Sequence, residues 1–391
     1  MRVNIVWYDD IPNNPNRGLF QRLRALSESD YECVLYTSAD SDVPPRIARH
    51  TRVERMPETG VPTIVATILF KLWVIYSIWK AKESGGMVYT INALDYSTGF
   101  VVSRLFDQAW LIDAFHSPYY YFDFGRARGD PITILRGTKT ILVCKLILWD
   151  VDVAFVMAHS RDEGFARLLT TRFNVSREAI IAIPDGVDID STMPDRGKPQ
   201  RDNGDVFEIY HIGLINNFKG LDMLRGLSDL DGKYTDIKVT MIGGVNPNFE
   251  SEFERYEKRA AIQIEMIDYL PHDKLLERLR DADVGVCTLQ PEIRDYRHSH
   301  PVKVFEYLAT GKPVVATGYD SMREIVKDGV NGYTYPPRDA NAFAERILEL
   351  YADEAKRRKM ADNARESVQK YDWGRINTTM MTELQERYPP K

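Results

Sequence analysis

Apolar segments of strand length alternate with amphipathic segments of helix length along most of this chain, in two successive series. The strands expected in the first series are Val3–Trp7, Cys33–Tyr36, Met87–Tyr89, Trp110–Ile112, Val153–Val156 and Ile180–Ile183. Those in the second series are Ile209–Ile212, Val239–Ile242, Ile262–Ile267 and Val284–Thr288. Because such alternation builds parallel sheets covered by helices on both faces, the sequence predicts an α/β fold with two doubly wound Rossmann-like domains facing a cleft.

Residues 191–206 interrupt this alternation. They include two prolines and two glycines among charged residues, a composition typical of a linker. The sequence therefore predicts an N-terminal domain over residues 1–190 and a C-terminal domain over residues 207–370. Residues 371–391 are expected to form a last helix that crosses back to the first domain.

Charge and cysteine usage narrow the classes of function. The net charge of −6 does not provide the basic field that nucleic acid binding needs. Cys33, Cys144 and Cys287 are scattered, without metal-ligand spacing, which is typical of a reducing compartment. The first residues lack the apolar region of a signal peptide. We expect a cytoplasmic protein that needs no metal and no cofactor.

The stretch Val61–Trp79 is apolar and about long enough to cross a bilayer, for which ~20 residues are needed. Lys71 lies at its centre, however, and a charge there opposes insertion. The sequence therefore favours a buried or interface-lying helix. A basic cluster follows in the sequence, formed by Arg126, Arg128, Arg136 and Lys139. Because such clusters attract anionic lipid headgroups, peripheral attachment to the inner face of the cell membrane is a second expectation, beside an ordinary solvated surface.

The segment Pro301–Thr317 is the most informative for function. It predicts a helix that begins with Pro301, ends at Gly311 and leads into a buried strand. Lys303 in the first turn opposes the helix dipole unless an anion binds there. Glu306 lies one turn further and suits the hydroxyls of a ribose. The alternative is an exposed ion pair between the two side chains.

Other segments supply further candidates for a nucleotide-sugar site. Gly213 and Gly243 end predicted strands, and Lys219 opens a helix after the first of them. His116 follows a strand in the first half, beside the aromatic run Tyr119–Phe122. Each has an ordinary structural alternative: a tight turn, a solvated lysine, a structural histidine or a packed loop. The residues Asn16, Arg17 and Gly18 suit an acceptor or phosphate loop, although loop composition alone explains them too.

Together these segments resemble the group 1 glycosyltransferases of the GT-B fold. The resemblance is strongest over residues 209–335, where Glu306-Tyr-Leu-Ala-Thr-Gly-Lys-Pro-Val-Val-Ala-Thr317 matches the second half of the family's Glu-x7-Glu signature. His298 stands in place of the first glutamate, and Leu214 stands where many members have an arginine. The stretch Ser299-His-Pro-Val-Lys303 fits a subset of the family that carries Ser-x-Pro-x-Lys at this point.

The resemblance implies roles for individual residues. Lys219 and Lys303 would stabilise the departing diphosphate, Glu306 would bind the ribose and His116 would contact the transferred sugar. The expected catalytic residues are thus His116, Lys219, Lys303 and Glu306. The expected donor-binding residues are Gly213, Lys219, Gly243, His298, Lys303, Val304 and Glu306.

The function implied is a retaining glycosyltransferase. It would move a sugar from a nucleotide-diphosphate sugar to a glycan, a lipid-linked acceptor or a small molecule. Two alternatives stay open at this point: a nucleotide-sugar 2-epimerase, and a catalytically inactive nucleotide-sugar-binding protein. The epimerase would need additional carboxylates in the cleft, and the replacement of the first glutamate by His298 leaves the inactive binding protein open.

Overall fold

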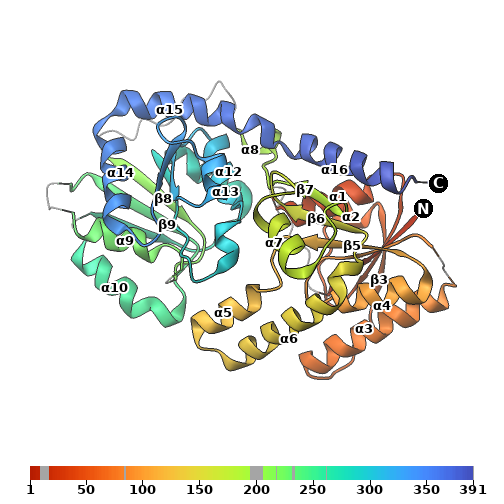
Figure 1. The fold of residues 1–391 in the computed structure, drawn as a ribbon. Helices are drawn as coiled ribbons and strands as arrows, with labels where there is room; N and C mark the ends of the chain where they lie inside the picture. The colour runs from red at the N-terminus through yellow and green to blue at the C-terminus, as the bar shows by residue number, and fades with distance from the viewer. Residues whose placement is uncertain are drawn as a thin grey trace. The chain divides into compact units, whose positions relative to one another are not determined.

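The structure is a computed structural model that describes residues 1–8, 17–82, 85–193, 206–216, 218–230, 234–260 and 262–390. It divides into two compact units (Figure 1). Unit 1 comprises residues 1–185 and 373–391, and unit 2 comprises residues 186–372. Most of the expected linker 191–206 lies outside the described residues.

Among the described residues, unit 1 contains a parallel seven-stranded sheet in the order β3-β2-β1-β4-β5-β6-β7. The strands are β1 (Arg2–Val6), β2 (Glu32–Thr37), β3 (Thr51–Arg55), β4 (Met87–Thr90), β5 (Ala109–Ala114), β6 (Val153–Met157) and β7 (Ile180–Ile183). Most strand residues are buried, which fits a sheet covered on both faces.

Helices cover both faces of this sheet. One hydrophobic core joins the sheet to α3 (Thr63–Lys80), α4 (Tyr96–Phe106), α6 (Pro131–Ile147) and α7 (Gly164–Phe173). The core on the other face includes residues of α1 (Gly18–Ser27), α2 (Pro45–Ala48) and α16 (Trp373–Arg387). The remaining helix, α5 (Tyr120–Arg128), packs against α6. Residues from the end of the chain therefore complete the core of unit 1.

Among the described residues, unit 2 contains a parallel six-stranded sheet in the order β10-β9-β8-β11-β12-β13. The strands are β8 (Phe207–Ile212), β9 (Ile237–Ile242), β10 (Gln263–Ile267), β11 (Val284–Cys287), β12 (Val314–Thr317) and β13 (Gly332–Tyr335). The helices are α8 (Ile189–Thr192), α9 (Leu221–Ser228), α10 (Glu250–Arg259), α11 (His272–Arg278), α12 (Val302–Ala309), α13 (Asp320–Ile325), α14 (Ala340–Ala352) and α15 (Glu354–Ser367).

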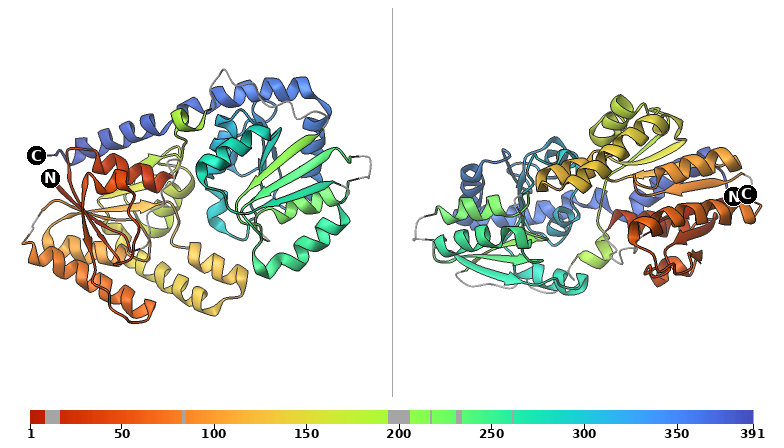
Figure 2. Two further views of the ribbon diagram at one scale, coloured as in Figure 1. Left: turned by 180° about the vertical axis from the view of Figure 1, so that it is seen from behind. Right: turned by 90° about the horizontal axis from the view of Figure 1, so that it is seen from below.

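The two sheets follow one topological rule. In each, the chain moves outward from a central strand to one edge, then returns and continues on the other side, as the views in Figure 2 help to follow. The reversal lies between β1 and β4 in unit 1 and between β8 and β11 in unit 2. Ligands of doubly wound sheets bind beyond the carboxyl ends of the strands at this point. The predicted fold class of two doubly wound α/β domains is confirmed.

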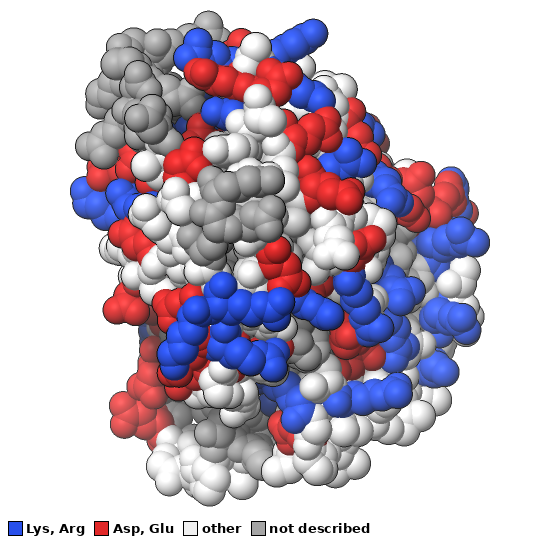
Figure 3. Space-filling view, turned by 90° about the vertical axis from the view of Figure 1, so that its left-hand side faces the viewer, with Lys and Arg blue, Asp and Glu red and all other residues white. Residues whose placement is uncertain are grey.

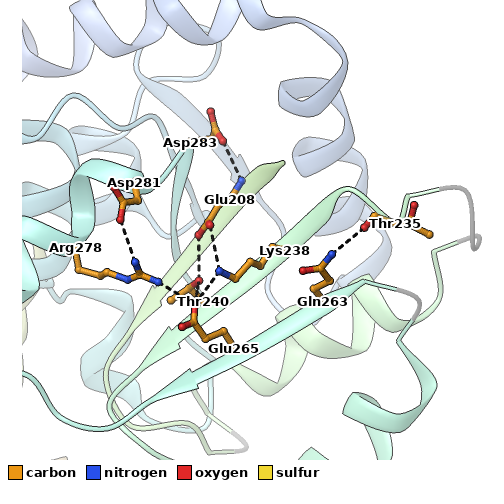
Figure 4. Close-up of polar contacts among 9 residues, drawn as sticks. All are labelled: Glu208, Thr235, Lys238, Thr240, Gln263, Glu265, Arg278, Asp281 and Asp283. Carbon is orange, nitrogen blue, oxygen red and sulfur yellow. Dashed lines mark hydrogen bonds and ion pairs between the residues drawn. The ribbon is translucent and has the colours of Figure 1, made fainter. Parts of the chain in front are cut away.

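A polar network fixes α11 to the edge of the second sheet (Figure 4). Lys238 on β9 contacts Glu208 on β8 at 3.2 Å and Glu265 on β10 at 2.8 Å. Arg278 on α11 then contacts Glu265 at 3.0 Å and Asp281 at 3.1 Å. Because each charge in this network has an opposite neighbour, Arg278 ties α11 to the edge strand β10, and Lys238 links β10 to β8 and β9.

No described helix is long and apolar enough to cross a membrane. In α3, the Phe70, Val74 and Ile78 side chains are fully buried in the core of unit 1. Lys71 is half-buried and lies 3.6 Å from Asp95. The prediction of a buried or interface-lying helix for this stretch agrees with that placement.

Candidate functional site

Helix α12 is held firmly beside the central strands of unit 2. The Tyr307 hydroxyl accepts a hydrogen bond from the Ile212 amide at 3.0 Å and donates one to the Tyr210 carbonyl at 3.1 Å. Its ring lies against Gly285 on β11, where an added Cβ would come within 2.2 Å of the ring. Glycine is therefore required at this position, because only its bare backbone lets α12 approach the sheet so closely.

This packing directs Lys303 to the carboxyl end of β8. Its ammonium group donates a hydrogen bond to the Ile212 carbonyl at 2.5 Å. No carboxylate lies within ion-pair distance of it among the described residues. Burial lowers the pKa of Lys303 from its ordinary value, and the negative charge of Glu306 only partly opposes this. The site thus contains a desolvated cation whose charge is poorly balanced by protein.

Glu306 lies on the same helix and is 3% exposed. Its Oε1 is 2.8 Å from Nε2 of His272, the first residue of α11. The alternative of an exposed ion pair between Lys303 and Glu306 is therefore wrong, because the carboxylate is buried and bonded to a histidine instead. Pro301 also differs slightly from expectation, since it caps the helix and Val302 is the first helical residue.

Two glycines, which have no side chain, lie beside Lys303. Gly213 follows β8 with φ 108°, and Gly243 follows β9 with φ 128°. A Cβ on Gly213 would lie 3.7 Å from the Lys303 Nζ, and a Cβ on Gly243 would lie 3.0 Å from the Gly213 carbonyl carbon. The two predicted glycines are therefore neighbours of each other and of Lys303, and a ligand could approach their backbone closely.

Lys219 lies in the turn that joins β8 to α9. Gly220 anchors this turn, because its amide donates to the Thr288 hydroxyl at 2.7 Å. The Lys219 ammonium lies 4.9 Å from the centre of the Tyr296 ring. The charges of Lys219 and Lys303 both lower the pKa of His211, in addition to the larger effect of its burial. Both ammonium groups therefore act on the same region at the end of β8.

For His298 and Val304 the structure gives local backbone contacts. His298 follows a short 3-10 helix over Arg294–Arg297, and its amide donates to the Asp295 carbonyl at 3.0 Å. Burial lowers the pKa of the His298 imidazole. The Val304 side chain is fully buried, and its amide donates to the Pro301 carbonyl at 2.9 Å. Donor contacts of these two residues stay predictions.

In unit 1, His116 follows β5. Its ring stacks on Tyr120 with the ring centres 3.9 Å apart and the planes inclined by 16°. It lines a small pocket together with Asn92, Ser117 and Tyr121. The expected neighbourhood of His116 and aromatic side chains is thus present, although Tyr120 begins helix α5 and is not part of a loop.

The expected acceptor or phosphate loop is only partly visible. Asn16 lies outside the described residues, and Arg17 is the exposed cap of α1. Gly18 packs against Asp185, whose Oδ1 would lie 2.3 Å from a Cβ at position 18. Close packing alone therefore explains this glycine. Burial raises the pKa of Asp185 to about 6, although Arg22 lies 3.8 Å away and opposes the shift.

Unit 1 also contains a buried ion pair, whose arginine lies one helical turn after Gly18 on α1. The Arg22 guanidinium donates to both carboxylate oxygens of Asp113, at 2.6 and 3.1 Å. The Tyr89 hydroxyl donates to the same carboxylate at 2.6 Å. The side chains of Arg22 and Asp113 are 4% and 2% exposed. Sequence reasoning missed this pair.

His272 is the other residue that the sequence did not reveal. It lies on a short helix with no recognisable motif, and its importance follows only from the contact with Glu306. Among the described residues, no group of three or more His, Cys, Asp or Glu side chains forms a metal cluster.

Comparison with known proteins adds independent information. A family model described as "Glycosyl transferases group 1" matches residues 195–367. An uncharacterised glycosyltransferase of Methanocaldococcus jannaschii is 38% identical over 316 residues, which cover 78% of this chain and 82% of that protein. A D-inositol 3-phosphate glycosyltransferase of Xylanimonas cellulosilytica is 24% identical over 58% of this chain and 55% of its own length. The chain spans about half the length of several such curated relatives.

Among solved structures, the Anabaena protein HepE in complex with UDP-glucose superposes with a TM-score of 0.72. It is 15% identical, with 99% of this chain and 100% of that one covered. At this identity the likeness concerns the fold. The extended match to the archaeal relative, with the family match over unit 2 and the Glu306–Thr317 motif, shows that this chain belongs to the group 1 glycosyltransferases.

Proposed function

We propose that this protein is a retaining glycosyltransferase. In this proposal it transfers a sugar from a nucleotide-diphosphate sugar to a glycan, a lipid-linked acceptor or a small-molecule acceptor. The observation that carries the proposal is a pair of ionisable groups on α12: the partly buried Lys303, which has no carboxylate partner among the described residues, and the buried Glu306, which is held by His272.

Each group suits one part of the donor. Burial makes the charged form of Lys303 less favourable. A diphosphate beside the ammonium group would supply a negative charge and so stabilise the protonated lysine. Lys219 would add a second cation and help to neutralise the leaving group as its bond to the sugar breaks. A carboxylate held like that of Glu306 can accept hydrogen bonds from two vicinal hydroxyls of a ribose. UDP-glucose in the complex of HepE makes a nucleotide sugar a reasonable donor class for this chain.

The remaining assignments follow from family resemblance. His116 would contact the transferred sugar, and Asn16, Arg17 and Gly18 would lie near the acceptor or its phosphate. Retention of configuration, and a place at the inner face of the cell membrane, belong to the same proposal. Gly213, Gly243, His298 and Val304 would line the donor.

The direct test is incubation of the protein with a panel of nucleotide sugars, with and without a mixture of glycan, lipid-linked and small-molecule acceptors. We expect nucleoside diphosphate release that depends on an acceptor, and a product whose anomeric configuration, read by NMR, matches that of the donor. A 2-epimer formed without acceptor would replace the proposal by an epimerase. Tight nucleotide binding with no turnover in any mixture would replace it by an inactive binding protein.

A further inference from the structure

Helices α3, α4 and α6 form one layer on a face of the first sheet. Their inner sides share a single core, to which α3 contributes Val74, α4 contributes Val102 and α6 contributes Cys144. Neighbouring helices in the layer contact each other in the order α3, α4, α6 (Figure 1). The sides of these helices that point away from the sheet therefore make up one continuous surface, called here the outer helical face.

Large apolar side chains are exposed along the outer helical face. On α3 they include Ile68, Leu72, Tyr76 and Trp79, of which Trp79 is 63% exposed. Their spacing of three or four residues places them in one stripe. The opposite stripe of α3 is fully buried, so this helix is apolar on both sides. A helix that is apolar all round is normally covered all round.

The same pattern continues on the other two helices. The exposed residues there are Leu105 on α4, Ile132, Leu135, Leu142 and Leu146 on α6, and Trp149 just after α6. Leu135 and Leu146 are 71% and 72% exposed. A contiguous set of this size is unusual for a surface that faces only water, and marks a place where something binds.

The charges on these helices have a single sign. The sequences of α3, α4 and α6 contain no Asp or Glu, in a chain whose net charge is −6. They contain six cations: Lys71, Lys80, Arg104, Arg136, Lys139 and Lys145. All except Lys71 are exposed, and Lys139 lies within the apolar stripe of α6. By contrast, acidic and basic side chains are interspersed on the face shown in Figure 3.

The described carboxylates nearest in sequence to these helices lie around the helix ends. Asp95 pairs with Lys71, Asp150 pairs with Arg104, and Asp130 caps the first turn of α6. Asp107 follows the last residue of α4. None of them lies within the helices that form the outer helical face, and no described carboxylate forms an ion pair with Arg136, Lys139 or Lys145, so these three cations lie beside the exposed leucines.

We propose that the outer helical face docks onto an anionic lipid bilayer. A bilayer offers acyl chains to the leucine and tryptophan side chains and phosphates to the lysines and arginines around them. A second copy of this chain fits less well, because a two-fold interface would bring the same cations face to face. Lipid binding does not depend on the proposed reaction. If both hold, this face brings the enzyme to acceptors that are themselves lipid-linked.

Vesicle sedimentation tests the proposal without any nucleotide sugar, so its failure would remove the proposed place at the membrane but leave the proposed sugar transfer untouched. We expect the full chain to sediment with vesicles of phosphatidylcholine and phosphatidylglycerol, at least tenfold more than with phosphatidylcholine alone. The bound fraction should fall at about 1 M salt, where the Debye length is ~3 Å. Trp79 and Trp149 should shift the fluorescence emission to shorter wavelength on binding.

Two double variants separate the apolar from the ionic contribution. Leu142→Glu with Leu146→Glu should reduce binding at least tenfold, and Arg136→Glu with Lys139→Glu should reduce the preference for anionic vesicles. All four side chains are exposed, so the fold should persist, which circular dichroism checks. Tyr269→Glu, at an 85% exposed residue in unit 2, is the matched control and should bind like the parent.

Three results would overturn the proposal. The first is no sedimentation with anionic vesicles. The second is equal binding by the parent and the Leu142→Glu, Leu146→Glu variant. The third is a concentration-dependent dimer, seen by analytical ultracentrifugation, that this variant abolishes, because the occupant of the face would then be a second copy.

Discussion

The two units both bury charged side chains near the carboxyl ends of their central strands, but they balance those charges differently. In unit 1, Arg22 is bound at two points by Asp113. Burial alone would lower the pKa of Arg22, yet Asp113, Tyr89 and Asp185 together raise it. In unit 2, the partly buried Lys303 has a backbone carbonyl as its hydrogen-bond partner, and its pKa is lowered by burial.

This difference separates a structural cluster, the Arg22–Asp113 pair, from a proposed binding cluster, Lys303 and Glu306. A buried ion pair with its hydrogen bonds satisfied has little to gain from a ligand, whereas a buried cation without a counter-ion gains from any anion that reaches it. Burial of charge alone does not identify a site. A binding site is indicated when a desolvated charge has no opposite charge from the protein beside it.

The largest expected effect is on the stability of unit 1. Arg22→Met should lower the free energy of unfolding by about 3–5 kcal/mol, because it leaves Asp113 buried without its partner. Denaturant unfolding followed by circular dichroism measures this. If the comparison holds, any folded fraction of the variant still binds nucleoside diphosphate with the affinity of the parent. A stable variant that has lost nucleotide binding would contradict it.

The second largest effect is expected for His116, which is predicted to contact the transferred sugar and not the nucleotide. His116→Ala should lower kcat by about 100-fold, within the range typical for the loss of a positioned histidine. The affinity for nucleoside diphosphate, measured by calorimetry, should change little. Equal losses in both quantities would indicate that the histidine matters only for folding.

Lys303→Ala tests the binding cluster itself. It should weaken nucleoside diphosphate binding by roughly 10–100-fold, which corresponds to the loss of one charge-assisted hydrogen bond. Calorimetric titration with UDP and GDP provides the measurement. Unchanged affinity would remove this lysine from the donor site.

Lys312 offers a matched control for that variant. Lys312 is a buried lysine whose ammonium, like that of Lys303, donates to a backbone carbonyl, that of Arg280, at 2.9 Å. Burial lowers its pKa to about 8, although the negative charges of Asp283 and Asp281 oppose this shift. Lys312→Ala should change stability but not nucleotide affinity.

The pH dependence of binding gives a further test. For the parent protein, the affinity for nucleoside diphosphate should fall as pH rises through the lowered pKa of Lys303, because only the ammonium form attracts phosphate. Lys303→Arg should flatten this decline, since arginine stays charged.

The smallest expected effect concerns His272. We expect His272→Ala to raise the donor KM about tenfold with a smaller change in kcat, because the Glu306 carboxylate loses the contact that holds it for the ribose. Lys274→Ala on the exposed side of the same helix, where Lys274 pairs with Glu277 at 3.0 Å, should leave KM unchanged. Loss of kcat alone would contradict a positioning role.

Most of the fold could be predicted from the sequence because its strands are buried on both faces. Segments such as Val153–Val156 and Val284–Thr288 read as continuous apolar runs, which is the pattern of a parallel sheet. The edge strand β3 (Thr51–Arg55) escaped this reasoning, since its sequence TRVER carries three charges. Helix α5 escaped it as well, because Tyr120 and its aromatic neighbours do not show a helical spacing of apolar and polar residues.

The candidate site was predictable where it depends on one continuous segment. Lys303 and Glu306 lie in a motif that combines helix, turn and strand signals, and Gly213 and Gly243 end predicted strands. Contacts between distant segments could not be read in this way. The pairing of Glu306 with His272 spans 34 residues, and that of Arg22 with Asp113 spans 91. Such pairs depend on how the sheet brings its loops together.

The return of α16 to unit 1 has a consequence for the order in which the protein assembles. Trp373, Ile376, Met380 and Leu384 are buried in a core with residues of the first strands. During synthesis, the ribosome has to produce all of unit 2, residues 186–372, before these residues emerge. The first unit therefore stays with part of its hydrophobic core uncovered, and open to aggregation, until the polypeptide is finished.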